Sequence, residues 1–132
     1  MKTIRQILAA KSGPLVIVAP DDAVFHALQV MADHNVGAVL VLDGKQLVGI
    51  FSERDYARKV ILYGKASKDT TVREIMTDKV LYVTPERTVD ECMAIMTEKH
   101  FRHLPVLDED GRVLGIVSIG DVVKETICEQ QF

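Results

Sequence analysis

An internal duplication constrains the fold of this 132-residue chain more than any other feature of its sequence. TIRQIL at residue 3 returns as TVREIM at residue 71, and LVIVAPDDAVFHALQVM at residue 15 returns as VLYVTPERTVDECMAIM at residue 80. AVLVLDGKQLVGIFSERD at residue 38 returns as HLPVLDEDGRVLGIVSIGD at residue 103, with one extra residue in the turn. Two full-length copies indicate that one supersecondary unit is used twice. We therefore divide the chain into residues 1–66 and 67–132.

Both copies predict the same order of elements. Short β-branched runs predict strands at residues 15–19, 38–42 and 47–51, and again at 80–84, 104–107 and 113–117. An Asp-Gly pair between the last two strands of each copy favours a hairpin. One helix follows the first strand, and a second helix follows the hairpin. The fold class is therefore α/β, with two β-α-β-β-α repeats that we expect to pack about a pseudo-two-fold axis.

Apolar residues at helical spacing predict which helix faces point into the core. In the helix after the first strand, the inward set is Val24, Ala27, Leu28, Met31 and Ala32. The last helix of the second copy, residues 119–129, is predicted to turn Val122, Val123, Thr126 and Ile127 inward. The last helix of the first copy is expected at residues 53–62.

Composition and charge exclude several classes of function. The chain is 48% hydrophobic and 27% charged, as in ordinary globular proteins, and its net charge of −3 argues against a general nucleic-acid binder. No apolar run approaches the roughly 20 residues that span a bilayer, and the N-terminus is a poor signal peptide. We expect a cytoplasmic protein without a membrane segment, in which Cys92 and Cys128 are reduced.

The sequence offers no recognisable catalytic motif. A GxSxG elbow, a phosphate-binding GxxxxGK[ST] loop and a GxGxxG loop are all missing from the sequence. His100 and His103 provide too few ligands for a zinc site. We therefore expect neither an enzyme nor a catalytic cofactor nor a metal.

The stretch GIFSERD, residues 49–55, returns as GIVSIGD, residues 115–121. One reading is a helix cap, in which Ser begins the helix and Asp lies in its first turn. The other reading is a binding site, because this turn presents backbone N–H groups and a hydroxyl to an anion. An ionised Asp, which only accepts hydrogen bonds, suits the two hydroxyls of a ribose. The two readings are compatible.

With its element order and its Gly-hydrophobic-x-Ser-x-x-Asp ending, the duplicated unit resembles the cystathionine-β-synthase (CBS) domain. Two in tandem resemble a CBS pair, or Bateman module, over residues 3–129. Similar pairs regulate IMP dehydrogenase, AMP-activated kinase and chloride channels. The resemblance implies adenine-nucleotide binding in the clefts between the repeats. We expect a stand-alone pair, because few of the 132 residues remain for another domain.

The resemblance also assigns roles to residues of this chain. Ribose contacts fall to the Ser and Asp of each copy, and phosphate contacts to Arg54, Arg102 and His103. Lys11 and Thr77 match loop positions that border the ligand, and Pro105 lacks an N–H, which could free backbone groups for adenine. One implied site joins Ser52, Arg54 and Asp55 to Thr77, Val83 and Phe101. The other joins Ser118 and Asp121 to Lys11, Val36 and Ala38, within reach of Arg102 and His103.

The hypothesis is a regulatory sensor that binds AMP, ADP, ATP or NAD and signals through a change in packing. Both Ser-x-x-Asp copies are intact, so two sites of unequal affinity are expected. A homodimer is the expected assembly, and a further protein partner is possible. The alternative is a dimeric scaffold module that binds no physiological ligand.

Overall fold

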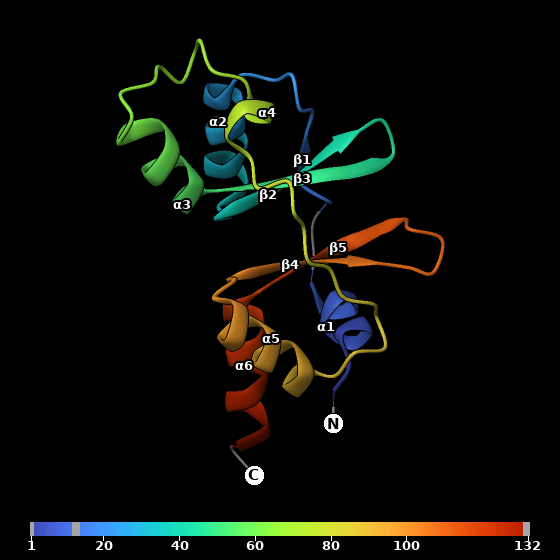
Figure 1. The fold of residues 1–132 in the computed structure, drawn as a ribbon. Coiled ribbons are helices and arrows are strands. Elements are labelled where there is room, and N and C mark those ends of the chain that lie inside the picture. Colours follow the sequence, from blue (N-terminus) through green and yellow to red (C-terminus); the bar gives the residue numbers. More distant parts are fainter. Residues whose placement is uncertain (1, 12–13, 131–132) are drawn as a thin grey trace. The chain divides into compact units, whose positions relative to one another are not determined.

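The computed structural model describes residues 2–11 and 14–130, without the side chains of residues 128–130. The chain forms two compact units, and neither coincides with one sequence repeat. We call Val16–Val80 the central unit, and Met1–Leu15 together with Leu81–Phe132 the C-terminal unit. Each unit therefore contains most of one repeat and the first segment of the other. Figure 1 shows the course of the chain through both.

The central unit is built on a three-stranded sheet. Its strands are β1 (Ile17–Val18), β2 (Ala38–Asp43) and β3 (Gln46–Ser52). β1 runs parallel to β2, and β2 forms the predicted hairpin with β3, turning at Gly44 with a positive φ of 63°. The helices are α2 (Val24–His34), α3 (Glu53–Asp55), the π-helix η1 (Tyr56–Ile61) and α4 (Val72–Ile75). The apolar faces of α2, η1 and α4 close one core with Val39, Val41 and Phe51 of the sheet.

The C-terminal unit repeats this plan with a smaller sheet. β4 (His103–Leu107) and β5 (Val113–Ser118) form an antiparallel hairpin. The helices are α1 (Ile4–Ala10), α5 (Val89–Lys99) and α6 (Ile119–Gln130). Ile4 and Ile7 of α1 enter a core with residues of α5, β4, β5 and α6. The order of elements predicted for the repeats is thus largely confirmed.

The predicted strand at residues 80–84 is wrong. Only an isolated bridge between Val83 and Val106 forms there, whereas the equivalent residues of the first repeat form β1. In the central unit the backbone N–H of Leu40 donates to the carbonyl of Val16. Pro105 occupies the position of Leu40 in β4 and has no N–H to donate, so the strand pairing shortens.

Three further predictions needed correction. Ala32, predicted to face inward from α2, is exposed. The helix expected at residues 53–62 is divided into α3 and the π-helix η1. In α6, Val122 is buried as predicted, but Val123 and Ile127 are exposed rather than inward. The register of α6 thus points one apolar stripe away from the core of its own unit.

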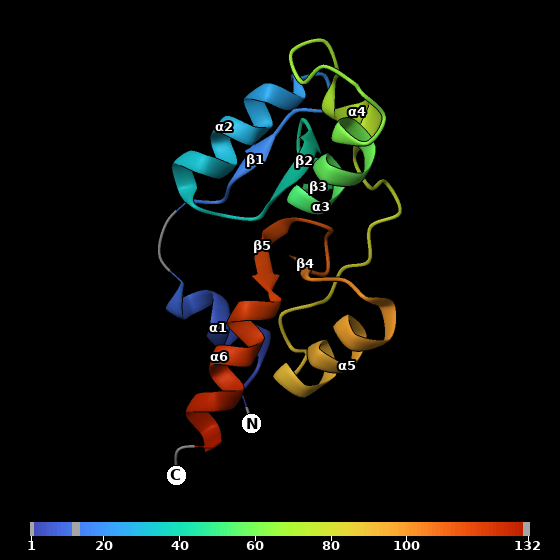
Figure 2. The same ribbon diagram turned by 90° about the vertical axis from the view of Figure 1, so that its left-hand side faces the viewer.

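Helices α1 and α4 were not predicted, and both pack on the unit formed by the other repeat. The backbone N–H of Ile4 donates to the carbonyl of Arg87, and that of Val72 to the carbonyl of Asp22. Figure 2 shows α1, the first helix of the chain, beside α6, its last helix. A Thr-x-x-Gln/Glu capping box begins each of these helices, at Thr3 and at Thr71.

We call residues 3–11 and 71–77, which contain α1 and α4, the exchanged segments, because each packs on the unit formed by the other repeat. This packing explains the glycine of the repeated motif. A Cβ atom on Gly49 would lie 2.5 Å from Sδ of Met76, and one on Gly115 would lie 2.9 Å from Cδ2 of Leu8. Met76 follows α4, and Leu8 lies in α1. The exchanged segment therefore packs directly on the backbone of the hairpin in each unit.

The structure also bears on the helices as possible membrane spans and on the state of Cys92. None of the helices that the structure describes is both long and apolar enough to cross a membrane. Cys92 is fully buried in the core of the C-terminal unit, and burial raises the pKa of its thiol to about 11. The Cys128 side chain lies outside the described part.

Candidate functional site

The Ser-x-x-Asp turn of the central unit is a closed hydrogen-bond network. Ser52 is the N-cap of α3, and its hydroxyl accepts a hydrogen bond from the Asp55 N–H at 3.2 Å. Oδ2 of Asp55 accepts from the Ser52 N–H at 3.0 Å and from the Ser52 hydroxyl at 3.1 Å. The cap reading of the motif is therefore correct for this copy.

The other oxygen of the Asp55 carboxylate binds the segment that follows α4. Oδ1 accepts a hydrogen bond from the Thr77 hydroxyl at 3.1 Å and lies 3.4 Å from Nζ of Lys59. Thr77 is fixed by two backbone hydrogen bonds to Ile50, and Nζ of Lys59 also donates to the carbonyl of Ile75. Both Asp55 oxygens are thus occupied, and only 11% of its side chain is exposed.

The C-terminal unit has the same turn with one different partner. Oδ2 of Asp121 accepts from the Ser118 N–H at 2.9 Å, and the Asp121 N–H donates to the Ser118 hydroxyl at 3.1 Å. Nζ of Lys11, at the end of α1, donates to the same Oδ2 at 2.9 Å and to the carbonyl of Ile116 at 2.9 Å. Here a lysine ammonium anchors the exchanged segment, where Thr77 does so in the central unit.

The two aspartates therefore differ in availability. Oδ1 of Asp121 has no hydrogen-bond partner among the residues that the structure describes, and 24% of the side chain is exposed. Burial acts to raise the pKa of Asp121, but the hydrogen bonds from Lys11 and Ser118 and the Lys11 charge outweigh it and lower the pKa. Asp121 offers an ionised oxygen to a ligand without breaking an existing contact.

The residues just before β2 and β4, and the first residues of these strands, contact the two Ser-x-x-Asp turns in the same way. The carbonyl of Gly37 accepts from the Glu53 N–H at 3.0 Å, and the carbonyl of Arg102 accepts from the Ile119 N–H at 2.8 Å. In register, Ala38 lies opposite Ser52, and His103 lies opposite Ser118. Arg102 and His103 thus belong to the same end of the C-terminal unit as Ser118 and Asp121.

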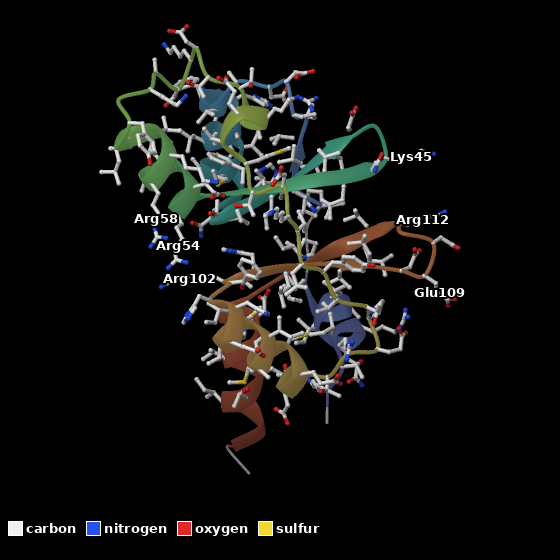
Figure 3. The ribbon with its side chains drawn as sticks, in the orientation of Figure 1. Lys45, Arg54, Arg58, Arg102, Glu109 and Arg112 are labelled. Atoms are coloured by element: carbon white, nitrogen blue, oxygen red, sulfur yellow. The ribbon has the colours of Figure 1, made fainter. Side chains whose placement is uncertain are left out.

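Exposed arginines occupy the central unit next to its turn. Arg54 lies in α3, and Arg58 lies one turn later in η1. Figure 3 shows both side chains projecting from the same side of this helical segment. Sequence reasoning missed Arg58 and Lys59, although their spacing from Arg54 and Asp55 places them on shared helix faces.

Several of the predicted contact residues have structural roles. Val83 is 3% exposed, its N–H donates to Pro105, and its carbonyl accepts from Leu107. Ala38 is also buried, whereas Phe101 is only partly buried against the core of the C-terminal unit. The predicted pairing of Asp55 with Val83 and Phe101, and of Asp121 with Val36 and Ala38, joins residues of different units and stays a prediction.

A hollow of about 470 Å³ opens at the C-terminal end of α2, beside Val36 and Glu53. Its remaining lining is Leu28, Met31, Ala32, Asn35 and Gly37. The sequence assigned Val36 to ligand binding but treated Leu28 and Met31 only as core residues. No signal in the sequence distinguishes the core part of α2 from the part that borders this hollow.

The described residues contain no cluster of three or more His, Cys, Asp or Glu side chains that could hold a metal ion. His100 ends α5 in the left-handed conformation, with φ of 60°, whereas His103 begins β4. The two histidines therefore belong to different elements.

A family model, that of the CBS domain, matches residues 4–62 and 72–127 of this chain. The chain belongs to the CBS domain family. It is a tandem CBS pair, as the repeated motif had suggested. A solved CBS-domain protein from Burkholderia ambifaria MC40-6 is 50% identical, with a TM-score of 0.92, and the match covers 99% of this chain and 98% of that one.

Other CBS proteins resemble the chain over most of its length. The mitochondrial CBS domain-containing protein CBSX3 of Arabidopsis thaliana is 42% identical over 98% of this chain and 66% of its own length. The first three curated relatives are matched over 66%, 55% and 65% of their lengths, so this pair spans less than two thirds of each. The CBS pair of protein MJ0100, solved with 5'-methylthioadenosine and S-adenosyl-L-methionine, is 26% identical, with a TM-score of 0.85, and the match covers 97% of this chain and 98% of that one.

Proposed function

We propose that this CBS pair is a regulatory module that binds an adenosine-containing ligand, with AMP, ADP, ATP and NAD as the candidates. The observation that carries the proposal is the Asp121 turn, where Oδ1 of an ionised and partly exposed carboxylate accepts no hydrogen bond from the described residues. The adenosine ligands of the MJ0100 pair support the same class of ligand. The ligand regulates only if it binds two conformations of the protein with different affinity.

The ribose is the part of the ligand that the Ser-x-x-Asp turns suit best. A carboxylate accepts hydrogen bonds from hydroxyls, and each charge-assisted bond contributes about 1.5–3 kcal/mol. At Asp121 the first such bond uses Oδ1 and leaves the Ser118 and Lys11 contacts intact. The adenine and phosphate contacts proposed from the family pattern are Val36, Ala38, Val83, Phe101, Arg54, Arg102 and His103.

The Asp121 site should bind more tightly than the Asp55 site. A ribose that approaches Asp55 must displace the Thr77 hydroxyl from Oδ1, and it meets a side chain that is 11% exposed. Displacing an existing hydrogen bond subtracts from the free energy that the new one supplies. The sequence predicted two sites of unequal affinity, and we expect the Asp121 site to be the tighter one.

The test is a calorimetric titration of the intact protein with AMP, ADP, ATP, NAD, S-adenosylmethionine and GTP. We expect an adenine-specific isotherm that Asp121→Asn weakens about 10- to 100-fold, as the loss of one or two charge-assisted bonds requires. Asp55→Asn should affect only a weaker second site. Glu109→Gln, which removes one charge from the β4–β5 turn, is the matched control and should change nothing. No binding of any adenine compound to folded protein would reject the proposal.

The second candidate, a dimeric scaffold, rests on a different surface. Ile119, Val123 and Ile127 are spaced four apart along α6 and are 44%, 42% and 51% exposed. An apolar stripe of this kind on a helix is suited to burial against a second copy of the chain. We expect a homodimer in light scattering that Val123→Glu converts to monomers, with Lys124→Glu on the same turn as the control. A dimer that binds no adenine compound would favour this candidate over the sensor.

A further inference from the structure

Lys11 holds an unusual position beside the candidate ribose carboxylate. Its ammonium is shared between the carbonyl of Ile116 and Oδ2 of Asp121, each at 2.9 Å. The lysine follows α1, whose Ile4 and Ile7 are buried in the core of the C-terminal unit. The position of this charge is therefore set by the fold as well as by the carboxylate.

The ammonium also retains a donor for a ligand. A lysine ammonium has three N–H donors, and the described residues supply acceptors for two of them. The Lys11 side chain is 38% exposed. The remaining donor and the open Oδ1 of Asp121 thus form an adjacent donor and acceptor at the surface of one unit.

We propose that Lys11 makes the Asp121 site selective for adenosine ligands that carry an anionic group next to the ribose, such as a 5'-phosphate. This inference rests on the proposed function and names the ligand class of one site. A ribose hydroxyl donates to Oδ1 of Asp121, and a phosphate oxygen accepts from Lys11. Neither contact requires the lysine to leave Oδ2.

Charge balance gives the physical reason. Without Lys11, the ionised Asp121 would repel a nearby phosphate, because like charges a few ångströms apart oppose each other strongly in a partly buried site. Lys11 compensates the carboxylate and offers a positive charge to the phosphate. The same ammonium opposes the positively charged sulfonium of S-adenosylmethionine and gains nothing from an uncharged nucleoside.

The central unit provides an internal comparison. Its exchanged segment reaches Asp55 with the uncharged Thr77 hydroxyl, and both Asp55 oxygens already have partners. The lysine near Asp55, Lys59, comes from the following helical turn and not from the exchanged segment. The preference for an anionic ligand is therefore expected at the Asp121 site.

The experiment compares AMP with adenosine by calorimetry on the intact protein and on Lys11→Met. We expect AMP to bind the wild type more tightly than adenosine. Lys11→Met should weaken the binding of AMP about 10- to 100-fold, which corresponds to one charge-assisted bond. It should change the affinity for adenosine less than about 3-fold. Lys11→Arg keeps the charge and should preserve the ratio of the two affinities.

Lys2→Met is the matched control, because Lys2 also joins the N-terminal segment to α6, through Glu125 at 2.8 Å. It should leave the ratio unchanged. If Lys11→Met weakened the binding of AMP and of adenosine equally, Lys11 would be a structural anchor only, and the inference would be overturned. Wild-type protein that binds adenosine as tightly as AMP would overturn it too, a result that needs no variant. Failure of both compounds to bind would also overturn this inference, whereas the proposed function is rejected only if ADP, ATP, NAD and S-adenosylmethionine fail to bind as well.

Discussion

At the scale of single residues, the Gly, the Ser and the Asp of the repeated motif each have a structural role. Gly49 and Gly115 let the exchanged segment reach the hairpin backbone, and Ser52 and Ser118 cap the helices that follow. The aspartates add a link to Thr77 or Lys11. The candidate ligand-binding residues thus also stabilise the fold, so variants at this turn require a stability measurement beside any affinity.

Gly49→Ala and Gly115→Ala should destabilise the fold by different amounts. A Cβ on Gly49 would lie 3.0 Å from the backbone oxygen of Thr77 besides its contact with Met76, whereas a Cβ on Gly115 meets only the end of the flexible Leu8 side chain. We expect about 1–3 kcal/mol lost for Gly49→Ala and less for Gly115→Ala in urea unfolding. Gly120→Ala is the control, because its nearest neighbour would be 3.5 Å away. A Gly49→Ala protein as stable as wild type would contradict the close approach.

The Lys11–Asp121 pair should make the free energy of unfolding depend on pH in the acidic range. The pKa of Asp121 is lower in the folded protein than its ordinary value of 3.8, so the folded state binds this proton less readily than the unfolded state. The stabilisation is present above that ordinary value and is lost as the pH falls through the lower, folded pKa. Asp121→Asn should cost about 1 kcal/mol at neutral pH, and the difference from wild type should shrink in acid. A difference independent of pH would contradict an ionised pair.

At the scale of elements, the exchanged helices form because of what they bury rather than because of their own propensity. α4 has only 4 residues, far fewer than an isolated helix needs, yet its Val72 and Ile75 are 0% and 2% exposed. Its capping box at Thr71 supplies the local start signal, and the core of the central unit supplies the stability.

Truncating the apolar face of α4 should therefore be costly. Ile75→Ala should lower the free energy of unfolding by about 2–4 kcal/mol, because it leaves a cavity in the core of the central unit. Ile61→Ala removes the same atoms from a side chain that is 57% exposed and should change stability by less than about 0.5 kcal/mol. Equal effects in urea unfolding would show that α4 is not part of the core.

At the scale of the whole molecule, compact units and sequence repeats divide the chain differently. Residues 16–80 form one continuous unit that includes α4, whereas residues 1–66 lack α4 and carry α1, which belongs to the other unit. A CBS repeat is thus completed by the first helix of its neighbour in the chain.

Two fragments test this division. A fragment of residues 16–80 should show cooperative thermal unfolding by circular dichroism, because its core is complete. A fragment of residues 1–66 has nearly the same length but lacks Val72 and Ile75, and it should be unfolded or much less stable. Cooperative folding of residues 1–66 with the same midpoint as residues 16–80 would contradict the exchange.

The sequence by itself determined the features that depend on neighbours along the chain. Duplication, hairpins, the principal helices and the Ser-x-x-Asp caps all follow from patterns within a few residues, and the CBS family follows from their combination. The candidate ribose residues Ser52, Asp55, Ser118 and Asp121 could be named for the same reason.

Only the tertiary structure decided which contacts join residues far apart in the chain. Lys11 meets Asp121, Thr77 meets Asp55, and α1 and α4 pack on the unit of the other repeat. Periodicity shows that an apolar face must be buried but does not name the surface that buries it. For the same reason, Asp55 and Asp121 are equivalent in the sequence, and only their distant partners distinguish them. Among the described residues, Oδ1 of Asp55 has partners, whereas Oδ1 of Asp121 has none.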